Sequence, residues 1–428
     1  MKYFKYITAV CLFLFCFTLP VYPQENVYDV YKAGNLTITS CSPSWREEML
    51  EELYEELLMN FHGEEINELS EIIIYPDSPN GVNGYYYEDI KEKNGSYIIG
   101  NKARIKLFNG ERYDTVKKIA PYLSHEYGHH YTISNIIRHE GKYYTDWIKT
   151  EYVSVRGLLK YPVVYGNFID AAYCWDITEI AASDYVQLLG SPSAKSSMDY
   201  ADTKDDISKG NYAPYYVHTA FNSYPQINMF IPLAADVEGL YEYMVSISGK
   251  EGEFEPLEKK PVLSDVEESV TSDGKKQYHI SWTPAKNNDD ELEYTLVMYP
   301  VDLPTNIMPI RTVSGEEELD ATFGTVTEAD ESGNMKTAYR AYEGNYNIVL
   351  YTKDEKGFIF ATDAVNHIFT ADVPRNDDTK NEEEEDREYN EKAEEYHEDR
   401  PLVMPDPKRS FADCFNDFLR IIGKIAIR

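Results

Sequence analysis

One helical motif constrains this chain more than any other feature. His125, Glu126 and His129 form an H-E-x-x-H pattern within residues 123–130. On an α-helix, side chains four residues apart lie on one face a turn apart, so both imidazoles can converge on one metal ion. The glutamate then lies where it can take a proton from a water at an open coordination position. The pattern indicates a zinc site with Glu126 as general base, and a solvated helix that happens to carry histidines is the alternative.

The helix that carries the motif is expected to begin near Pro121 and to run to about Ser134, because proline is favoured in a first turn and lacks the N–H that a helix interior uses. Gly128 weakens a helix by roughly 1 kcal/mol, which indicates that a neighbouring backbone passes close to it. His130 lies about 100° around the helix from His129. We interpret it as a packing or supporting residue and not as a ligand.

The chain before the motif predicts a mixed α+β arrangement. An amphipathic helix is expected over residues 45–61, a buried strand over 72–75, and one or two strands over 96–108. The part from Lys102 to Phe108 is our candidate for the strand at the sheet edge that pairs with an extended substrate. An ordinary edge strand is an equal alternative.

A second helix is predicted over residues 176–190, with a glycine stop at its end and Pro192 beyond. A zinc ion held by two imidazoles needs a third protein ligand, which a second helix should supply. The pair H-E-x-x-H and helical E-x-x-A resembles the gluzincins, the thermolysin-like and anthrax-lethal-factor-like metallopeptidases, over residues 107–190. The resemblance implies that Glu179 is the third ligand and that Ala182 lets the two helices approach closely.

The sequence excludes one related class and departs from the resemblance at one position. The metzincin alternative fails, because the motif lacks the H-E-x-x-H-x-x-G-x-x-H continuation after His129. Where thermolysin-like enzymes have an aspartate that orients a ligand histidine, this chain has Ser183, and Asp184 follows one residue later. We expect replacement of Asp184 to weaken metal binding less than replacement of Glu179.

Peptide hydrolysis also needs a donor for the developing oxyanion. Tyr173 resembles the tyrosine that lethal-factor-like enzymes carry shortly before the glutamate ligand. His218 resembles the catalytic histidine that thermolysin-like enzymes place after it. Both residues are candidates for this role, and a structural or surface position is the alternative for each.

The N-terminus predicts export. A basic start and an apolar run from Ile7 to Leu19 are typical of a signal peptide, which we place at residues 1–24. The run is too short for a comfortable membrane span. Cys41, Cys174 and Cys414 remain after its removal, an odd number that argues against a disulfide framework. The formal charge of −33 excludes a general affinity for nucleic acid. We therefore expect a secreted or cell-surface protein.

The second half of the chain changes to an all-β pattern. Tyr278, Ile280 and Trp282 share one face of a strand, and a hairpin is expected at Gly357. Residues 261–373 resemble a fibronectin type III-like or immunoglobulin-like sandwich. Such a module would bind a surface-bound partner, or serve only as structure. Residues 375–400 form an acidic stretch that we interpret as a disordered linker, and 410–427 as a short amphipathic helix.

Together these patterns predict an α+β zincin catalytic domain over residues 25–252, followed by the β-sandwich, the acidic linker and the terminal helix. The expected function is zinc-dependent hydrolysis of a protein or peptide substrate, with His125, His129 and Glu179 around Zn²⁺. The alternative is a surface adhesion or recognition protein whose metal helix is catalytically silent and whose sandwich binds the partner. The intact Glu126 argues for the enzyme, because a scaffold needs no general base.

Overall fold

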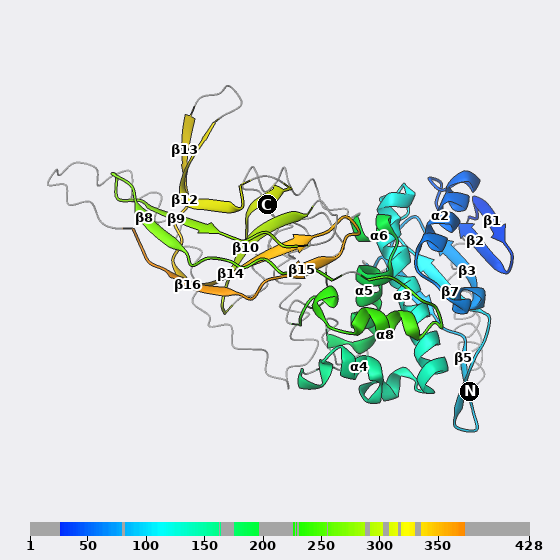
Figure 1. Cartoon of the computed structure of the whole chain (residues 1–428). Coiled ribbons are helices and arrows are strands. Elements are labelled where there is room, and N and C mark those ends of the chain that lie inside the picture. The colour runs from blue at the N-terminus through cyan, green and yellow to red at the C-terminus, as the bar shows by residue number, and fades with distance from the viewer. Residues whose placement is uncertain are drawn as a thin grey trace, which may run out of the picture.

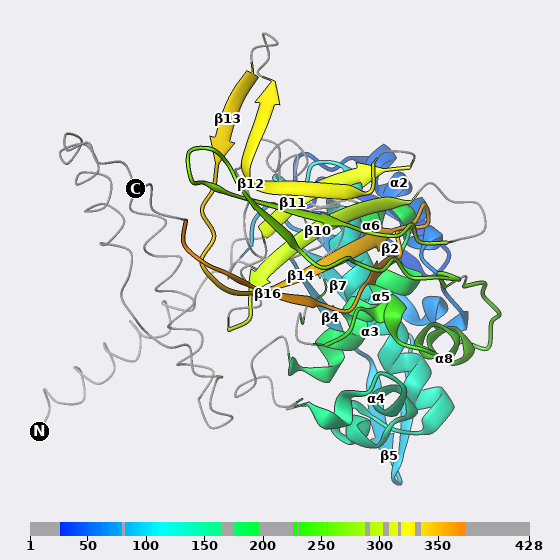
Figure 2. The same cartoon turned by 60° about the vertical axis from the view of Figure 1, so that its left-hand side comes forward.

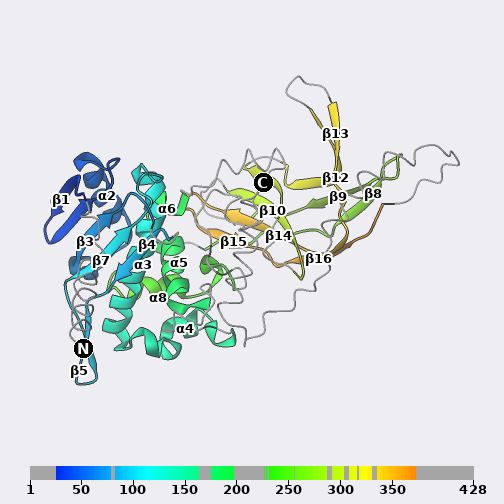
Figure 3. The same ribbon diagram turned by 180° about the vertical axis from the view of Figure 1, so that it is seen from behind.

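A computed structural model describes residues 26–372, except 79–81, 162, 164–174, 197–225, 227, 229–230, 255, 287–291, 303–307, 316–317 and 330–334. The proposed signal peptide, acidic linker and terminal helix therefore lie outside the described residues. The described chain is a mixed α+β structure with two parts, which Figures 1 and 3 show side by side from opposite directions.

The first part is built on a five-stranded sheet in the order β1-β2-β3-β7-β4. Its strands are β1 (Asp29–Ala33), β2 (Leu36–Ser40), β3 (Leu69–Ile74), β4 (Gly84–Tyr87) and β7 (Ala103–Leu107). The three central strands are parallel, and the two outer ones run antiparallel to their neighbours. Between β4 and β7 a separate hairpin, β5 (Ile90–Lys93) and β6 (Ser96–Ile99), projects from the sheet (Figure 2).

The sheet edge differs from our expectation. Residues 102–108 contain β7, which is enclosed between β3 and β4, so they do not form the edge. The edge is β4, which contains three consecutive tyrosines. It returns antiparallel along β7 with Gly84 opposite Leu107 and Tyr86 opposite Ile105. Strand order depends on pairing between distant segments, and the alternation within residues 104–108 does not carry that information.

The helices of this part are α2 (Glu47–Met59), α3 (Val116–Glu140), α4 (Glu151–Val155), α5 (Ile177–Leu189), α6 (Pro192–Ser196) and α8 (Leu240–Ser246), with short 3₁₀ turns η1 (Glu64–Glu68), η2 (Tyr144–Lys149), η3 (Leu158–Lys160) and η6 (Ala234–Asp236). Helices α2 and α3 pack against this sheet, and the other helices pack on α3 or on one another. The core between helices and sheet is aliphatic on the strands, with Ile38, Ile72 and Ile105 fully buried. No helix among the described residues is long and apolar enough to cross a membrane.

The second part consists of two β-sheets. One has the order β11-β10-β14-β15, with β16 also pairing β14, and the other has the order β13-β12-β9-β8. The strands are β8 (Glu267–Val270), β9 (Lys276–Ser281), β10 (Glu293–Pro300), β11 (Met308–Ser314), β12 (Asp320–Ala329), β13 (Met335–Tyr339), β14 (Gly344–Lys353), β15 (Ile359–Ala361) and β16 (Val365–Phe369). The predicted phase is confirmed, since Tyr278, Ile280 and Trp282 are all buried.

The two parts share a hydrophobic core. The turn between β14 and β15 uses Gly357 at φ +82°, as the predicted hairpin requires, and carries Phe358 against Tyr241 of α8. Phe254 bridges them, with its ring centroid 5.1 Å from that of Phe358. The ammonium group of Lys195 lies 4.1 Å from the centroid of the Phe358 ring. The segment that joins the two parts is thus packed between them.

Candidate metal site

The site is built on helix α3, which is longer than predicted. It begins at Val116 after Thr115, whose side chain accepts from the Lys118 N–H, and ends at Glu140. Pro121 lies inside it and removes one backbone hydrogen bond, the one to Lys117. Because Lys117 is exposed, water can satisfy its carbonyl, which explains why the helix continues through the proline.

Helix α5 crosses α3 at a point of close backbone approach. A methyl group at Gly128 would lie 2.9 Å from the carbonyl oxygen of Ala182 and 3.1 Å from its Cα. This contact confirms the close approach predicted from Gly128 and the small residue expected at 182. It also places the first turn of α5, which Asp176 caps by accepting from the Thr178 N–H, beside the two histidines of α3.

The side chains of His125, His129 and Glu179 are close enough to hold a metal ion. Their donor atoms all lie within 4.8 Å of one another. Oε2 of Glu179 is 3.1 Å from Nε2 of His125 and 3.6 Å from Nε2 of His129. Ligand atoms about 2.05 Å from a tetrahedral ion lie roughly 3.3 Å apart, so the observed spacing fits a small tetrahedral ion.

Burial and charge act in opposite directions on the carboxylate of this group. Burial alone would raise the pKa of Glu179. The charge of His129 and the hydrogen bonds from His125 and His129 outweigh burial, so the pKa lies below its usual range. Glu179 is therefore held as an anion, which is the form that binds a cation.

Glu126 lies beside this group and is 7% exposed. Burial raises its pKa to about 8, against a lowering by the His125 charge and by a hydrogen bond from the backbone N–H of Tyr86. The negative charge of Glu179 also raises the pKa of Glu126. The carboxyl group is thus shielded from water and lies against strand β4 at Gly84.

His130 is a supporting residue, as predicted. Its Nε2 is 2.7 Å from the backbone carbonyl of Glu65, which can only accept, so Nε2 carries the proton. Nδ1 then accepts from the hydroxyl of Tyr86 at 3.1 Å. Both ring nitrogens are engaged, and burial lowers the pKa of the imidazole. His130 is not part of the group that can hold a metal.

Asp184 lies in a different cluster. Its Oδ2 accepts from Nε of Arg156 at 2.8 Å and from the hydroxyl of Tyr152 at 2.7 Å. Arg156 in turn donates to the carbonyl of Pro232. The side chains of Asp184 and Arg156 are 1% and 0% exposed. The carboxylate therefore joins α5 to α4 and holds a buried guanidinium, so we expect its replacement to act mainly on stability.

The Asp184→Ala variant should therefore unfold more easily than the parent protein. Its affinity for the metal should be almost unchanged. Loss of one partner of a buried ion pair costs about 3–5 kcal/mol, because the other charge stays buried without compensation. Asp146→Ala is the matched control: its pair with Lys149 is exposed, and such pairs contribute roughly 0–1 kcal/mol. Urea unfolding of both variants measures the difference. Equal stability losses would contradict the assignment.

Two proposed site residues cannot be placed. Tyr173 and His218 both lie outside the described residues. Tyr86, by contrast, was missed by sequence reasoning although it contacts both Glu126 and His130. Three successive tyrosines after Gly84 were the available signal, since aromatic residues favour strands.

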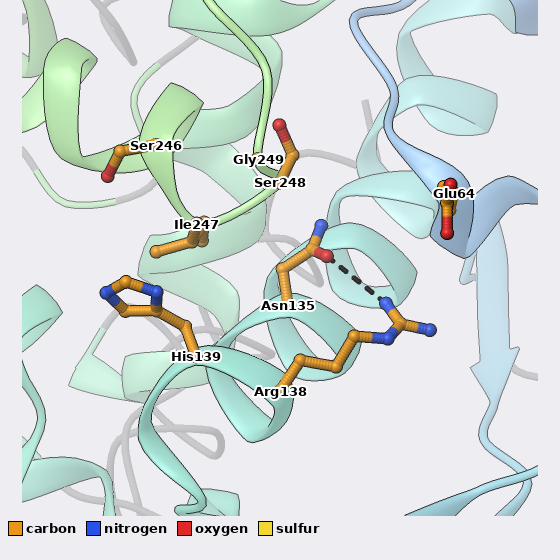
Figure 4. A pocket seen from close by; sticks show the side chains of 8 residues that line it. All are labelled: Glu64, Asn135, Arg138, His139, Ser246, Ile247, Ser248 and Gly249. Atoms are coloured by element: carbon orange, nitrogen blue, oxygen red, sulfur yellow. Dashed lines mark hydrogen bonds between the residues drawn. The ribbon is translucent and has the colours of Figure 1, made fainter.

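A hollow lies further along α3, towards its C-terminal end (Figure 4). It is lined by Asn135, Arg138 and His139 of α3, by Glu64, and by residues 246–249 at the C-terminal end of α8. The Arg138 guanidinium donates to Oδ1 of Asn135 and contacts Glu68. The potential metal donors His125, His129 and Glu179 are not among its lining residues.

Comparison with known proteins supports no assignment. No protein-family model and no curated protein matches the chain. Among solved structures, the chain is similar to the crystal structure of DesR, a β-glucosidase from Streptomyces venezuelae in complex with D-glucose, at 16% sequence identity. The match covers 26% of this chain and 15% of that one, with a TM-score of 0.12, which carries no argument about fold or function.

Proposed function

We propose that the chain is a zinc-dependent peptidase. The observation that carries the proposal is the convergence of His125, His129 and Glu179 with Glu126 beside them on the same helix. Two imidazoles and a carboxylate are the ligand set of catalytic zinc in one large class of peptidases, with a fourth position left open. Burial of a general base next to that set supports a catalytic role, because structural metal sites need no such group.

Each residue has a distinct part in the proposed reaction. A zinc ion, when bound, would lower the pKa of a water and polarise the peptide carbonyl. His125, His129 and Glu179 would hold that ion, with Glu179 supplying the negative charge. Glu126 removes the proton from the attacking water and returns it to the leaving amine. The donor to the oxyanion is proposed to be Tyr173 or His218.

The position of strand β4 supports the proposal that the substrate is a peptide. It is the outer strand of the sheet beside α3, so the backbone groups of its outer edge, apart from the Tyr86 N–H that Glu126 uses, can pair with an extended chain. Tyr85 and Tyr87, each 38% exposed, point away from the core on this strand and offer apolar contacts to substrate side chains. The edge role that we expected at residues 102–108 is now proposed for residues 84–87.

The wider assignment follows from the same proposal. The mixed sheet with α3 packed against it supports a zincin of the gluzincin type. The two β-sheets of the second part, which share a core, support a fibronectin type III-like or immunoglobulin-like module. We further propose that the protein is exported and acts outside the cell, on the strength of residues 1–24. The sandwich is proposed to hold a surface-bound partner near the site.

The experiment is cleavage profiling of a diverse peptide library by the purified chain. The expected result is cleavage that a chelator abolishes and that added Zn²⁺ restores, with about one zinc per chain by elemental analysis. Cleavage that persists in the chelator would reject zinc dependence. A protein that holds zinc but cleaves nothing would favour the recognition protein.

A further inference from the structure

We propose that strand β4 positions the general base: Gly84 leaves the space that the Glu126 carboxylate occupies, and Tyr86 fixes the strand to helix α3 through His130. Figures 2 and 3 show β4 beside α3. The inference rests on the proposed function only in naming Glu126 a general base. The structural coupling between strand and carboxylate stands on contacts alone.

Gly84 is required by space and not by backbone conformation. A Cβ atom at this position would lie 2.6 Å from Cγ and 2.7 Å from Cδ of Glu126, closer than side-chain carbons approach one another. Its φ is not among the positive values of the chain, so any residue could adopt the backbone. Because Glu126 is buried, its carboxyl group cannot turn into solvent to make room. An added methyl group must therefore move the carboxylate or the strand.

Three groups of Tyr86 contact helix α3: the backbone N–H, the ring and the hydroxyl. Its backbone N–H donates to the Glu126 carboxylate. Its ring lies parallel to that of His129, with 9° between the planes and 6.5 Å between centroids. Its hydroxyl donates to Nδ1 of His130, which is anchored in turn to the Glu65 carbonyl. The strand is thus fixed against the residues on the C-terminal side of Glu126.

The residue before β4, Asn83, also holds the strand in place through hydrogen bonds. The carbonyl of Asn83 accepts from the Phe108 N–H at 2.9 Å, and its side-chain oxygen accepts from Asn109 at 2.9 Å and from the Tyr113 hydroxyl at 3.2 Å. Gly84, the next residue, cannot shift outward without breaking these bonds. The strand therefore acts as a fixed wall against which Glu126 is oriented.

The first test measures coupling without using activity. Gly84→Ala should lower Tm by about 3 °C or more in the parent background, and by much less in a Glu126→Ala background, where the clash is removed. Gly110→Ala is the matched control, since its methyl group would meet Ile74 at 2.8 Å, away from Glu126. Its effect should be equal in both backgrounds. Additive effects of Gly84→Ala and Glu126→Ala would overturn the proposal.

The second test measures positioning. In an active parent, Gly84→Ala and Tyr86→Phe should each lower kcat by about 10–100-fold, with KM and zinc content unchanged, because a displacement of about 1 Å can cost that much. Glu126→Asp, which shortens the side chain, should cost less in the Gly84→Ala background than in the parent. Parental kcat in both single variants would overturn the inference. An inactive parent with non-additive Tm values would reject the peptidase and retain the coupling.

Discussion

Replacing Glu126 with glutamine is expected to lower kcat by about 10²–10⁴-fold while the zinc content stays at one per chain, the range that proton transfer by a positioned side chain contributes. Glutamine has the size of glutamate and can accept the hydrogen bond from the Tyr86 N–H. It cannot take a proton from water. Because Glu126 is outside the group of donor atoms, metal binding and hydrolysis should separate in this variant.

The control for this prediction is Glu52→Gln, which makes the same change of charge on the exposed face of α2. It should leave both zinc content and kcat unchanged. Elemental analysis and steady-state kinetics on a cleaved library peptide supply the two readouts. A Glu126→Gln variant that hydrolyses peptide as well as the parent would show that the base is another group.

Replacing Glu179 with alanine is expected to abolish activity by releasing the metal. Two imidazoles hold zinc weakly, whereas a third, anionic ligand completes the site and partly neutralises the ion. Oε2 of Glu179 lies 3.1 Å from Nε2 of His125 and 3.6 Å from Nε2 of His129, so the variant loses the anionic donor of the group. After dialysis the variant should contain little zinc and should hydrolyse no peptide, while its fold by circular dichroism stays that of the parent.

A graded series sharpens this test. Glu179→Asp keeps the charge but withdraws the oxygen by about one C–C bond, so it should retain zinc with lower affinity than the parent. Zinc titration against a chelating dye orders the affinities as parent, Asp variant, Ala variant. Full zinc occupancy in Glu179→Ala after dialysis would mean that another residue supplies the third ligand, and the gluzincin assignment would have to be reopened.

The features that sequence could predict are those set by local geometry. The four-residue spacing of His125 and His129 places both imidazoles on one face whatever surrounds the helix. Gly128 indicated a close backbone approach, and the structure has Ala182 there. The helix that carries Glu179 has a capping aspartate at its start and a glycine at its end. Each of these signals lies within a few residues of the feature it predicts.

The features that sequence could not predict depend on segments far apart in the chain. The order of strands made residues 84–87 the edge and enclosed 103–107, which no pattern within either segment indicates. Asp184 accepts a hydrogen bond from Arg156, which lies 28 residues earlier in the chain. No spacing rule in the sequence links the two residues. The importance of Gly84 appears only when Glu126 is seen against it. Helix α3 continues through Pro121 because water can bond the exposed Lys117 carbonyl in place of the backbone N–H that proline lacks.

The packed junction between the two parts limits how the sandwich can serve the site. Phe254, Phe358 and Phe360 belong to the same apolar cluster as the helices around α3, and Asp236 accepts from the Ala361 N–H across the junction. A module joined in this way cannot search for its partner on a flexible tether. In the proposed function it would act as a rigid arm, so the fold would set the distance and angle between a molecule bound to the sandwich and Glu126. Cleavage would then be confined to peptide bonds at one fixed distance from the anchoring point.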